Sequence, residues 1–406
     1  MKKTLLFTMA LSVLAIACTK SEVVKAPGRG QEIKFDTYMG RVPVTKATSA
    51  DLATLQNPKE EDGGIQVVAF IHDGIIEKIT NPNAENVLIG DPKAEIYNTE
   101  SFSDIAPYMD ETLWWDTEQN GWDYDGVVYW PDYHPTRKLA FISYALNAKD
   151  CIVWDDDTRP EAINEKSYTK FTFEVKENVK EQKDLLVTEF QPNLGVNMQS
   201  EVDAVSLNFK HLLSRVGFQV VANQTVPGVD ITIKDIVLKG TFPRYGKVDL
   251  LGVAEIAPVS GEGATLTDEY DFFGENEYFV IPSSTEPQNI FANTSQTNPI
   301  GDGEPTTTTN QDDSNRYMMI MPSAQENASI EVTYQLTGQK QPQVATVSLP
   351  ETFVFQSGIS YIFKFTVSTL AISFDIIVDE WEDKVMGEED GTNEKGEYPL
   401  APDAGL

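Results

Sequence analysis

Residues 205–209 read Val205-Ser206-Leu207-Asn208-Phe209, and apolar and polar side chains alternate along them. Alternation with a period of two is typical of a β-strand that buries one face. Comparable β-branched or aromatic runs recur along the chain, at 32–38, 65–72, 127–130, 138–145, 170–175, 185–189, 216–222, 231–239, 247–251, 278–281, 317–321, 329–336, 345–349, 361–367 and 372–378. Stretches rich in Gly, Pro, Asn and Asp separate them and predict turns. The sequence therefore predicts an all-β protein, and the regular succession of short strands favours β-sandwiches.

The polar stretch 195–202 lies between predicted strands and is the expected boundary between two domains of ordinary size. The predicted organisation has a signal peptide at 1–17, an anchor segment with the first strand at 18–48, an N-terminal β-sandwich at 49–200, a C-terminal β-sandwich at 201–384 and a mobile acidic tail at 385–406. Residues 291–315 are rich in Thr, Asn, Asp, Gly and Pro, which predicts a long exposed loop rather than a third domain.

The amino terminus has the pattern of an exported lipoprotein. Lys2 and Lys3 precede an apolar run over residues 5–16, which is too short to span a bilayer and is typical of a secretory signal. Small residues lead up to Cys18, whose thiol can be acylated once the signal is cleaved. Cys18 is therefore the predicted lipidation site, because more than one acyl chain gives stable anchoring. A plain secretory signal with an incidental cysteine is the alternative.

Charge and cysteine content narrow the choice of partners. The chain has 31 basic and 63 acidic residues, a net charge of −32, which would repel nucleic acid, so no nucleic-acid partner is expected. A lipid on Cys18 leaves Cys151, the other of the 2 cysteines, without a disulfide partner. Calcium binding is the functional alternative to a solvated acidic surface. Residues 116–121 resemble the first half of an EF-hand loop, but Val127 stands where the closing glutamate should be, so the motif fails.

Sequence signatures of catalysis are missing. The chain has no H-E-x-x-H, no G-x-S-x-G and no P-loop, and its 3 histidines lie far apart. His211 is interpreted as a structural histidine. Carboxylates are abundant, but a glycosidase pair is defined by geometry, which a sequence does not supply. We therefore expect no enzyme, no catalytic residue, no bound metal and no cofactor.

Four of the 6 tryptophans lie between positions 114 and 130. Two interpretations stay open. Trp114, Trp115 and Trp122 are candidate ligand-stacking residues of a carbohydrate-binding surface. Alternatively, Trp130 and its neighbours pack the core of the first domain.

The order of several segments carries a family resemblance. After the lipoprotein signal come Glu32-Ile33-Lys34-Phe35-Asp36-Thr37-Tyr38, a basic and small-residue stretch from Arg41 to Lys46-Ala47-Thr48, Ile65-Gln66-Val67-Val68-Ala69-Phe70, Tyr129-Trp130-Pro131, the run 139–145, Asp184-Leu185-Leu186-Val187 and the run 205–216. In this order the chain resembles the fimbrillin (Mfa-like) family of Bacteroidales surface proteins over most of its length, to about residue 382.

The resemblance implies two tandem β-sandwich domains of transthyretin-like topology and a cell-surface lipoprotein of the outer membrane or fimbrium. It also implies a structural or adhesive subunit of a type V pilus, as tip, anchor or shaft. The resemblance further implies that shaft-type subunits are cut after a basic residue, which removes the first strand, and that a strand of the next subunit then fills the groove. The expected partners are other pilus subunits, the outer membrane through the lipid, and a host protein or glycan.

Carried onto this chain, the resemblance makes 32–38 the candidate removable strand. Its side chains at Ile33, Phe35 and Thr37 share one face and suit a buried groove. Arg41 and Lys46 are the candidate processing sites, and residues 372–378 are either a donor strand or an ordinary last strand. The tail that follows, with its acidic residues and two prolines, is a poor strand. A surface glycan-binding lipoprotein is the alternative function.

Overall fold

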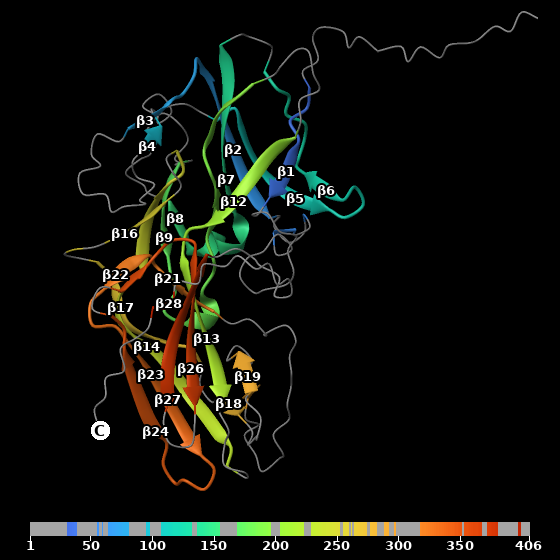
Figure 1. The fold of residues 1–406 in the computed structure, drawn as a ribbon. Coiled ribbons are helices and arrows are strands. Elements are labelled where there is room, and N and C mark those ends of the chain that lie inside the picture. Colours follow the sequence, from blue (N-terminus) through green and yellow to red (C-terminus); the bar gives the residue numbers. More distant parts are fainter. Residues whose placement is uncertain are drawn as a thin grey trace, which may run out of the picture.

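Strands dominate the structure of the chain (Figure 1). The computed structural model describes residues 31–38, 55–56, 59, 64–80, 95–97, 107–131, 136–154, 169–195, 204–222, 229–251, 255–259, 261, 264–273, 277–281, 288–291, 296–297, 317–350, 353–367, 372–380 and 397–398. The all-β prediction is confirmed. No helix within these ranges has the length and hydropathy to cross a membrane. The tandem transthyretin-like arrangement stays a prediction.

The first sheet has eight strands and lies in the upper part of Figure 1. In spatial order it contains β1 (Phe35–Tyr38), β12 (Val205–His211), β10 (Leu186–Thr188), β7 (Arg137–Ala145), β2 (Ile65–Asp73), β5 (Met109–Asp116) and β6 (Gly121–Asp123). A further strand, β11 (Gln191–Leu194), also pairs with β7. The first sheet thus joins strands from both sides of the expected boundary at 195–202, because β12 pairs with β10.

Two six-stranded sheets contain most of the strands that follow β12. One contains β19 (Gln288–Phe291), β13 (Ser214–Ala222), β26 (Ile359–Val367), β27 (Ile372–Glu380), β28 (Glu397–Tyr398) and, beside β13, β21 (Met318–Ile320). The other contains β20 (Gln296–Thr297), β18 (Glu277–Ile281), β14 (Ile231–Pro243), β23 (Ser329–Leu336), β24 (Gln343–Ser348) and, beside β14, β17 (Leu266–Asp271).

Smaller sheets and short 3₁₀ helices complete the described part of the chain. A four-stranded sheet contains β16 (Ile256–Pro258), β15 (Tyr245–Asp249), β9 (Lys170–Glu174) and β8 (Ile152–Trp154). Two ribbons pair β22 (Ser323–Gln325) with β25 (Phe353–Phe355) and β3 (Lys78–Thr80) with β4 (Glu95–Tyr97). The 3₁₀ helices η3 (Leu146–Cys151) and η5 (Val179–Glu181) lie before β8 and before β10.

Strand β7 is buried on both faces, which explains why it reads as a continuous apolar run rather than an alternating one. Leu139, Phe141 and Ala145 of β7 belong to one hydrophobic cluster, which we call the first core. The first core comprises Ile33, Phe35, Leu55, Ile65, Val67, Ala69, Met109, Leu113, Tyr124, Trp130, Leu139, Phe141, Ala145, Leu186, Val205, Leu207 and Phe209. The intervening Ile142 and Tyr144 belong to a larger cluster, the second core. The first sheet is therefore the wall that the two cores share.

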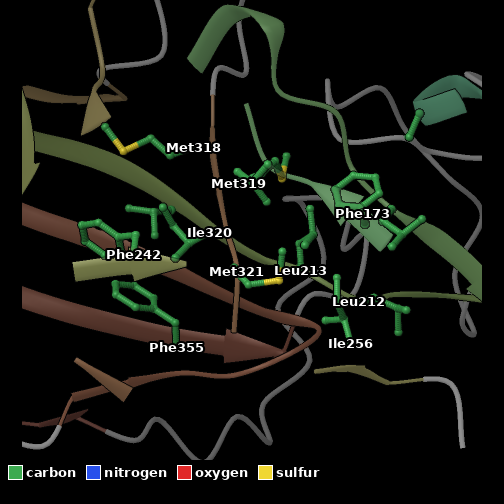
Figure 2. Close-up of a cluster of buried hydrophobic side chains, with 14 of the residues drawn as sticks. Phe173, Leu212, Leu213, Phe242, Ile256, Met318, Met319, Ile320, Met321 and Phe355 are labelled. Atoms are coloured by element: carbon green, nitrogen blue, oxygen red, sulfur yellow. The ribbon is translucent and has the colours of Figure 1, made fainter. Parts of the chain in front are cut away.

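The second core extends from Val68 and Phe70 of β2 to Phe363 and Phe365 of β26. Figure 2 shows part of it, in which Met318, Met319, Ile320 and Met321 lie among Phe173, Leu212, Leu213, Phe242, Ile256 and Phe355. Methionine suits this place, where side chains from several different strands meet, because its unbranched side chain fills irregular gaps between elements.

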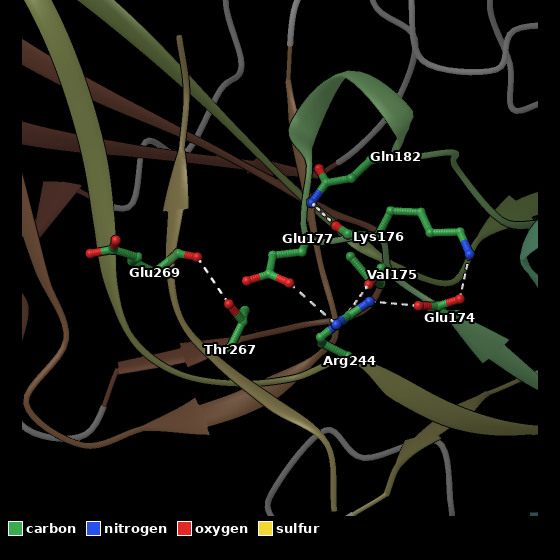
Figure 3. A network of polar contacts seen from close by, with 8 residues as sticks. All are labelled: Glu174, Val175, Lys176, Glu177, Gln182, Arg244, Thr267 and Glu269. Atoms are coloured by element: carbon green, nitrogen blue, oxygen red, sulfur yellow. Dashed lines mark hydrogen bonds and ion pairs between the residues drawn. The ribbon is translucent and has the colours of Figure 1, made fainter. Parts of the chain in front are cut away.

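An ion-pair network holds β9 to the connection between β14 and β15 (Figure 3). The Arg244 guanidinium lies 2.6 Å from Glu174 and 3.4 Å from Glu177. The backbone N–H of Val175 donates to the Arg244 carbonyl at 2.7 Å. Glu174 also pairs with Lys176, and these lysine and arginine partners lower the pKa of Glu174 although its burial acts to raise that pKa. The network ties together segments on either side of residue 200.

Some expectations differ from the structure. Residues 127–130 were expected to form a strand but make only one isolated bridge, between Glu32 and Tyr129. Gly126 turns the chain just before them, with φ of +80°, and Pro131 lacks the N–H that a continuing ladder needs. The domain boundaries stay a prediction. Of the acidic tail, the structure describes only β28, which pairs with Ile376 and Ile377 of β27.

A carboxyl group at the irregularity in β14 makes stability depend on pH. The pKa of Asp235 is raised to about 6 by burial and then by the nearby Asp271 and Glu269, against the lowering effect of a hydrogen bond from Ile236. The unfolded chain ionises Asp235 near its ordinary pKa of about 4, whereas the folded chain ionises it only near pH 6. The folded state therefore loses stability as the pH rises from about 4 to above 6. We expect Asp235→Asn to raise the free energy of unfolding by about 1 kcal/mol at pH 7.5, after allowance for solvent screening of this half-buried group.

Chemical denaturation of the wild type and Asp235→Asn at pH 7.5 and pH 4 measures this effect. The difference between them should become small at pH 4, where Asp235 is protonated in the folded state and about half protonated in the unfolded state. Asp268→Asn, at an exposed position of the adjacent β17, is the control and should leave the pH dependence unchanged. Equal stability of Asp235→Asn and wild type at pH 7.5 would contradict the prediction.

Candidate functional site

The candidate site is the place in which the first strand lies at the edge of the first sheet. We call it the β1 seat, and define it as β12 together with the segment 122–130 and Phe141. In Figure 1, β1 (blue) runs alongside β12, with the β5–β6 hairpin next to it. β1 pairs with β12 in parallel, in a register from Phe35 opposite Val205 to Tyr38 opposite Asn208. β12 is the only described strand that pairs with β1.

Just before β1, the chain is held by a second partner. The N–H of Ile33 donates to the Val128 carbonyl at 2.9 Å, and the N–H of Trp130 donates to the Gln31 carbonyl at 2.7 Å. One residue later the partner changes, because the N–H of Val205 donates to the Lys34 carbonyl at 2.7 Å. This change explains why the regular strand begins at Phe35 rather than at residue 32. Residues 31–38 are thus bonded along their length to segments that are far away in the sequence.

The alternation predicted for this strand is found in the structure. Ile33 is 0% exposed and Phe35 is 7% exposed, and both belong to the first core. Lys34 and Asp36 are exposed on the other face. Burial of an aliphatic or aromatic side chain of this size contributes about 1.5–3 kcal/mol. Ile33 and Phe35 are therefore the main apolar anchors of the strand.

Aromatic rings line the pocket of Phe35. Its ring centre lies 5.9 Å from Tyr124 and 6.1 Å from Phe141, both in edge-to-face geometry. Phe141 in turn lies 5.9 Å from Trp130, which is buried in the first core. Edge-to-face pairs add to the energy of burial and favour a defined ring orientation. The interpretation that Trp130 packs the core is confirmed.

Two side chains of the seat donate hydrogen bonds to the strand. The Tyr124 hydroxyl donates to the Ile33 carbonyl at 2.8 Å, and the Trp122 indole Nε1–H donates to the Thr37 hydroxyl at 2.9 Å. Burial, above all, raises the pKa of Tyr124, and Glu32, Glu111 and Asp123 add to the effect. The phenol therefore stays protonated and remains a donor at neutral pH.

The β5–β6 hairpin positions Trp122. Trp115 and Trp122 are cross-strand partners, and their ring centres lie 5.3 Å apart in edge-to-face geometry. In the connecting turn, the Asp116 carboxylate accepts the N–H groups of Glu118 and Gln119. Asn120, with φ of +51°, completes the turn in the left-handed region that asparagine tolerates. The acidic stretch that resembles half of an EF-hand loop is therefore a hairpin turn.

The predicted site residues are only partly brought together. Trp114, Trp115 and Trp122 all lie on this hairpin and are half-buried, and the rings of Trp115 and Trp122 are in contact. The Lys59 ammonium lies 4.4 Å from the centre of the Trp114 ring, a cation–π contact. Their role in ligand stacking stays a prediction. Cys18, Arg41 and Lys46 lie outside the described residues.

Sequence reasoning missed Tyr124, Val128 and Phe141 as parts of the seat. The sequence showed them only as members of aromatic or β-branched runs. The bond between Tyr124 and Ile33 joins residues about 90 positions apart, and no local pattern in the sequence predicts such a contact.

The part of the chain that the structure describes contains no candidate metal-binding cluster. Within it, no group of three or more His, Cys, Asp or Glu side chains could hold a metal ion. His211 Nδ1 lies 2.7 Å from Asp184 Oδ2, and both side chains are buried. This pair lies at the end of β12, where it satisfies a buried imidazole, in agreement with a structural role for His211.

A family model described as fimbrillin-like matches residues 92–381, which is more than half of the chain. The match begins just before β4 and ends just after β27. The family is a structural one, and no catalytic family is indicated. No curated protein matches the chain.

Several solved structures are similar to this chain. A fimbrial protein from Bacteroides vulgatus is 15% identical, with 86% of this chain and 99% of that chain covered and a TM-score of 0.46. A fimbrial assembly protein from Parabacteroides distasonis is 10% identical, with 88% and 98% covered and a TM-score of 0.37. The tip fimbrial protein Mfa3 from Porphyromonas gingivalis is 8% identical, with 78% and 94% covered and a TM-score of 0.31.

The hydroxyl of Tyr124 gives a direct test of the geometry of the seat. Tyr124→Phe removes the bond to the Ile33 carbonyl and should weaken the hold on residues 31–38 by about 1 kcal/mol. Hydrogen–deuterium exchange followed by mass spectrometry should show faster exchange in peptides that cover 31–38, with little change in β2 and β7. Tyr129→Phe, at an exposed tyrosine of the same loop, is the matched control. Unchanged exchange in 31–38 would show that the bond contributes nothing.

Proposed function

The chain belongs to the fimbrillin-like family, and from this premise we propose that it is a structural or adhesive subunit of a type V pilus on the cell surface. Assembly would proceed by proteolytic removal of the first strand and its replacement by a strand of another subunit. The single observation that carries this proposal is the geometry of the β1 seat.

The seat suits a strand that can be replaced. β1 is an edge strand with one described strand partner. Its apolar anchors Ile33 and Phe35 belong to the first core. The candidate cutting sites Arg41 and Lys46 follow Tyr38 closely in the sequence. After a cut there, residues 31–38 would be held by non-covalent contacts alone. Their loss would expose the edge of β12 and two apolar pockets, which is the combination that favours strand addition.

Filament growth follows from the same geometry. A strand donated by one subunit to the seat of the next makes a head-to-tail contact that does not close on itself, and such contacts build filaments. Residues 372–378 lie within β27, which pairs with β26 over nine residues. A donor role for them requires β27 to leave β26, so the donor role stays a prediction beside that of an ordinary last strand.

Cys18 would anchor the chain to the outer membrane before assembly, through its acyl chains. As long as β1 occupies the seat, the anchored protein would stay unassembled at the cell surface. The subunit would act as tip, anchor or shaft, and an adhesive member would contact a host protein or glycan. Nucleic acid is no partner on this proposal, because the net charge of −32 repels it.

The surface glycan-binding alternative rests on the hairpin tryptophans. In the structure, Trp115 and Trp122 pack against each other and Lys59 lies over Trp114. These contacts occupy part of the ring surface that a sugar would need. A glycan array with the purified protein separates this alternative from the pilus proposal.

Processing can be tested in cells. The wild type should be recovered from sheared surface fibres with a mature amino terminus at Val42 or Ala47, as read by mass spectrometry. The double variant Arg41→Gln/Lys46→Gln should keep residues 18–46, stay with the membrane and be absent from the fibres, because its seat stays filled. Entry of the double variant into fibres at the wild-type level would refute strand removal as the trigger.

Anchoring has a separate test. Cys18→Ala should release the protein from the outer-membrane fraction, because the acyl chains are its expected attachment. Cys151→Ala is the control, since Cys151 is buried and carries no lipid on this proposal. If Cys18→Ala stays in the membrane fraction to the same extent as Cys151→Ala, then Cys18 is not the anchor.

A further inference from the structure

We propose that the β1 seat selects its occupant by one side-chain hydrogen bond, from the Trp122 indole to a hydroxyl at the position of Thr37. The occupant is then an extended strand of a different subunit that carries Ser or Thr at this position, and not β27 of a second copy of this chain. This inference rests on the proposed strand exchange and names the chemistry of the partner.

Contacts outside β1 help to hold the donor in place. The Trp122 ring packs against the first core, and its edge-to-face contact with Trp115 holds the ring from the neighbouring strand β5. Its Nε1–H points to the Thr37 hydroxyl at 2.9 Å, although the two residues are 85 positions apart. An indole nitrogen can only donate, so it requires an acceptor in the partner.

The other contacts of the seat discriminate little. Backbone hydrogen bonds from β12 and from the segment 128–130 form with any extended chain, because every residue except proline presents the same groups. The pockets of Ile33 and Phe35 accept apolar side chains of similar volume. A half-buried donor left without an acceptor does carry a penalty. The Trp122–Thr37 bond is therefore the contact that depends most on the identity of one side chain.

The last strand of this chain gives an internal comparison. β27 begins Ile372-Ser373-Phe374-Asp375-Ile376, and β1 with its preceding residues reads Ile33-Lys34-Phe35-Asp36-Thr37. In this register β27 would supply both apolar anchors and the aspartate. It would place Ile376, which has no acceptor, opposite the Trp122 N–H. The seat therefore disfavours β27 of a second copy at one position while matching it at the others.

The test uses the full mature chain with a site-specific protease sequence between Tyr38 and Ala47. After nicking, the fragment that ends at Tyr38 stays bound through residues 31–38, and fluorescently labelled peptides compete with it. The peptides are the native sequence 31–38, its Thr37→Val form, the β27 sequence 370–377, and that sequence with Ile376→Thr. We expect the Thr37→Val and β27 peptides to bind about fivefold more weakly than their hydroxyl-bearing partners.

The same competition in Trp122→Phe tests the assignment to the indole. Phenylalanine keeps an aromatic ring beside Trp115 but has no N–H, so the preference for threonine should disappear. Trp114→Phe, in the same hairpin, is the control and should keep the preference. A threonine preference below twofold in the wild type, or one that persists in Trp122→Phe, would overturn the inference.

These outcomes separate the inference from the proposed function. If all four peptides enter the seat equally well, strand exchange stands and selection by Trp122 falls. If no peptide enters, including the native sequence, strand exchange itself falls, and the inference falls with it. If Trp122→Phe fails to fold, a second measurement tests the inference. It compares the rate at which the nicked first strand leaves the Thr37→Val chain with the rate for the wild type, and we expect release to be about fivefold faster from Thr37→Val.

Discussion

Backbone groups at the edge of a β-sheet must find partners, and in this chain the outer edge of β12 is paired by β1. The strand β12 that β1 covers is also part of the interior of the protein. β12 carries Val205, Leu207 and Phe209 into the first core, and its end at His211 leads directly into Leu212 and Leu213 of the second core. The Leu212 N–H bonds to the Leu185 carbonyl, and the Gly358 N–H bonds to the Leu213 carbonyl. The strand that covers the edge therefore lies beside an element that connects both cores.

The two cores share the first sheet, so a shift of its strands would disturb the packing of both cores. β7 presents Phe141 to the first core and Ile142 to the second. The Phe141 ring that lines the pocket of Phe35 is thus carried by a strand packed on both faces. Across the chain, Arg244 binds Glu174 from 70 residues away and holds β9 against β15. The parts of the seat that β12 and Phe141 contribute belong to this shared sheet, and packed interiors deform little.

Local patterns in the sequence predicted the parts of the site that are local. The alternation of Ile33 and Phe35 places their side chains on one face, and this prediction holds because a strand has a period of two. The parallel partner of this strand, some 170 residues later, left no trace in the local pattern, because pairing depends on the whole sheet. Trp122 was singled out as a candidate ligand-stacking residue and not as a hydrogen-bond donor to the first strand. Its bond to Thr37 depends on how a hairpin is oriented toward another element, and periodicity carries no such information.

The parallel direction of β1 has a consequence for any assembly built on this seat. The Tyr124 hydroxyl contacts the carbonyl of Ile33, and the Trp122 indole contacts the side chain of Thr37, four residues further along. The backbone hydrogen bonds of a parallel pair are spaced differently from those of an antiparallel pair. An occupant that reproduces the backbone pairing of β1 must therefore run parallel to β12. If each subunit receives its strand in this way, every subunit points in the same direction, and the fibre has two chemically different ends, at only one of which an open seat can accept the next subunit.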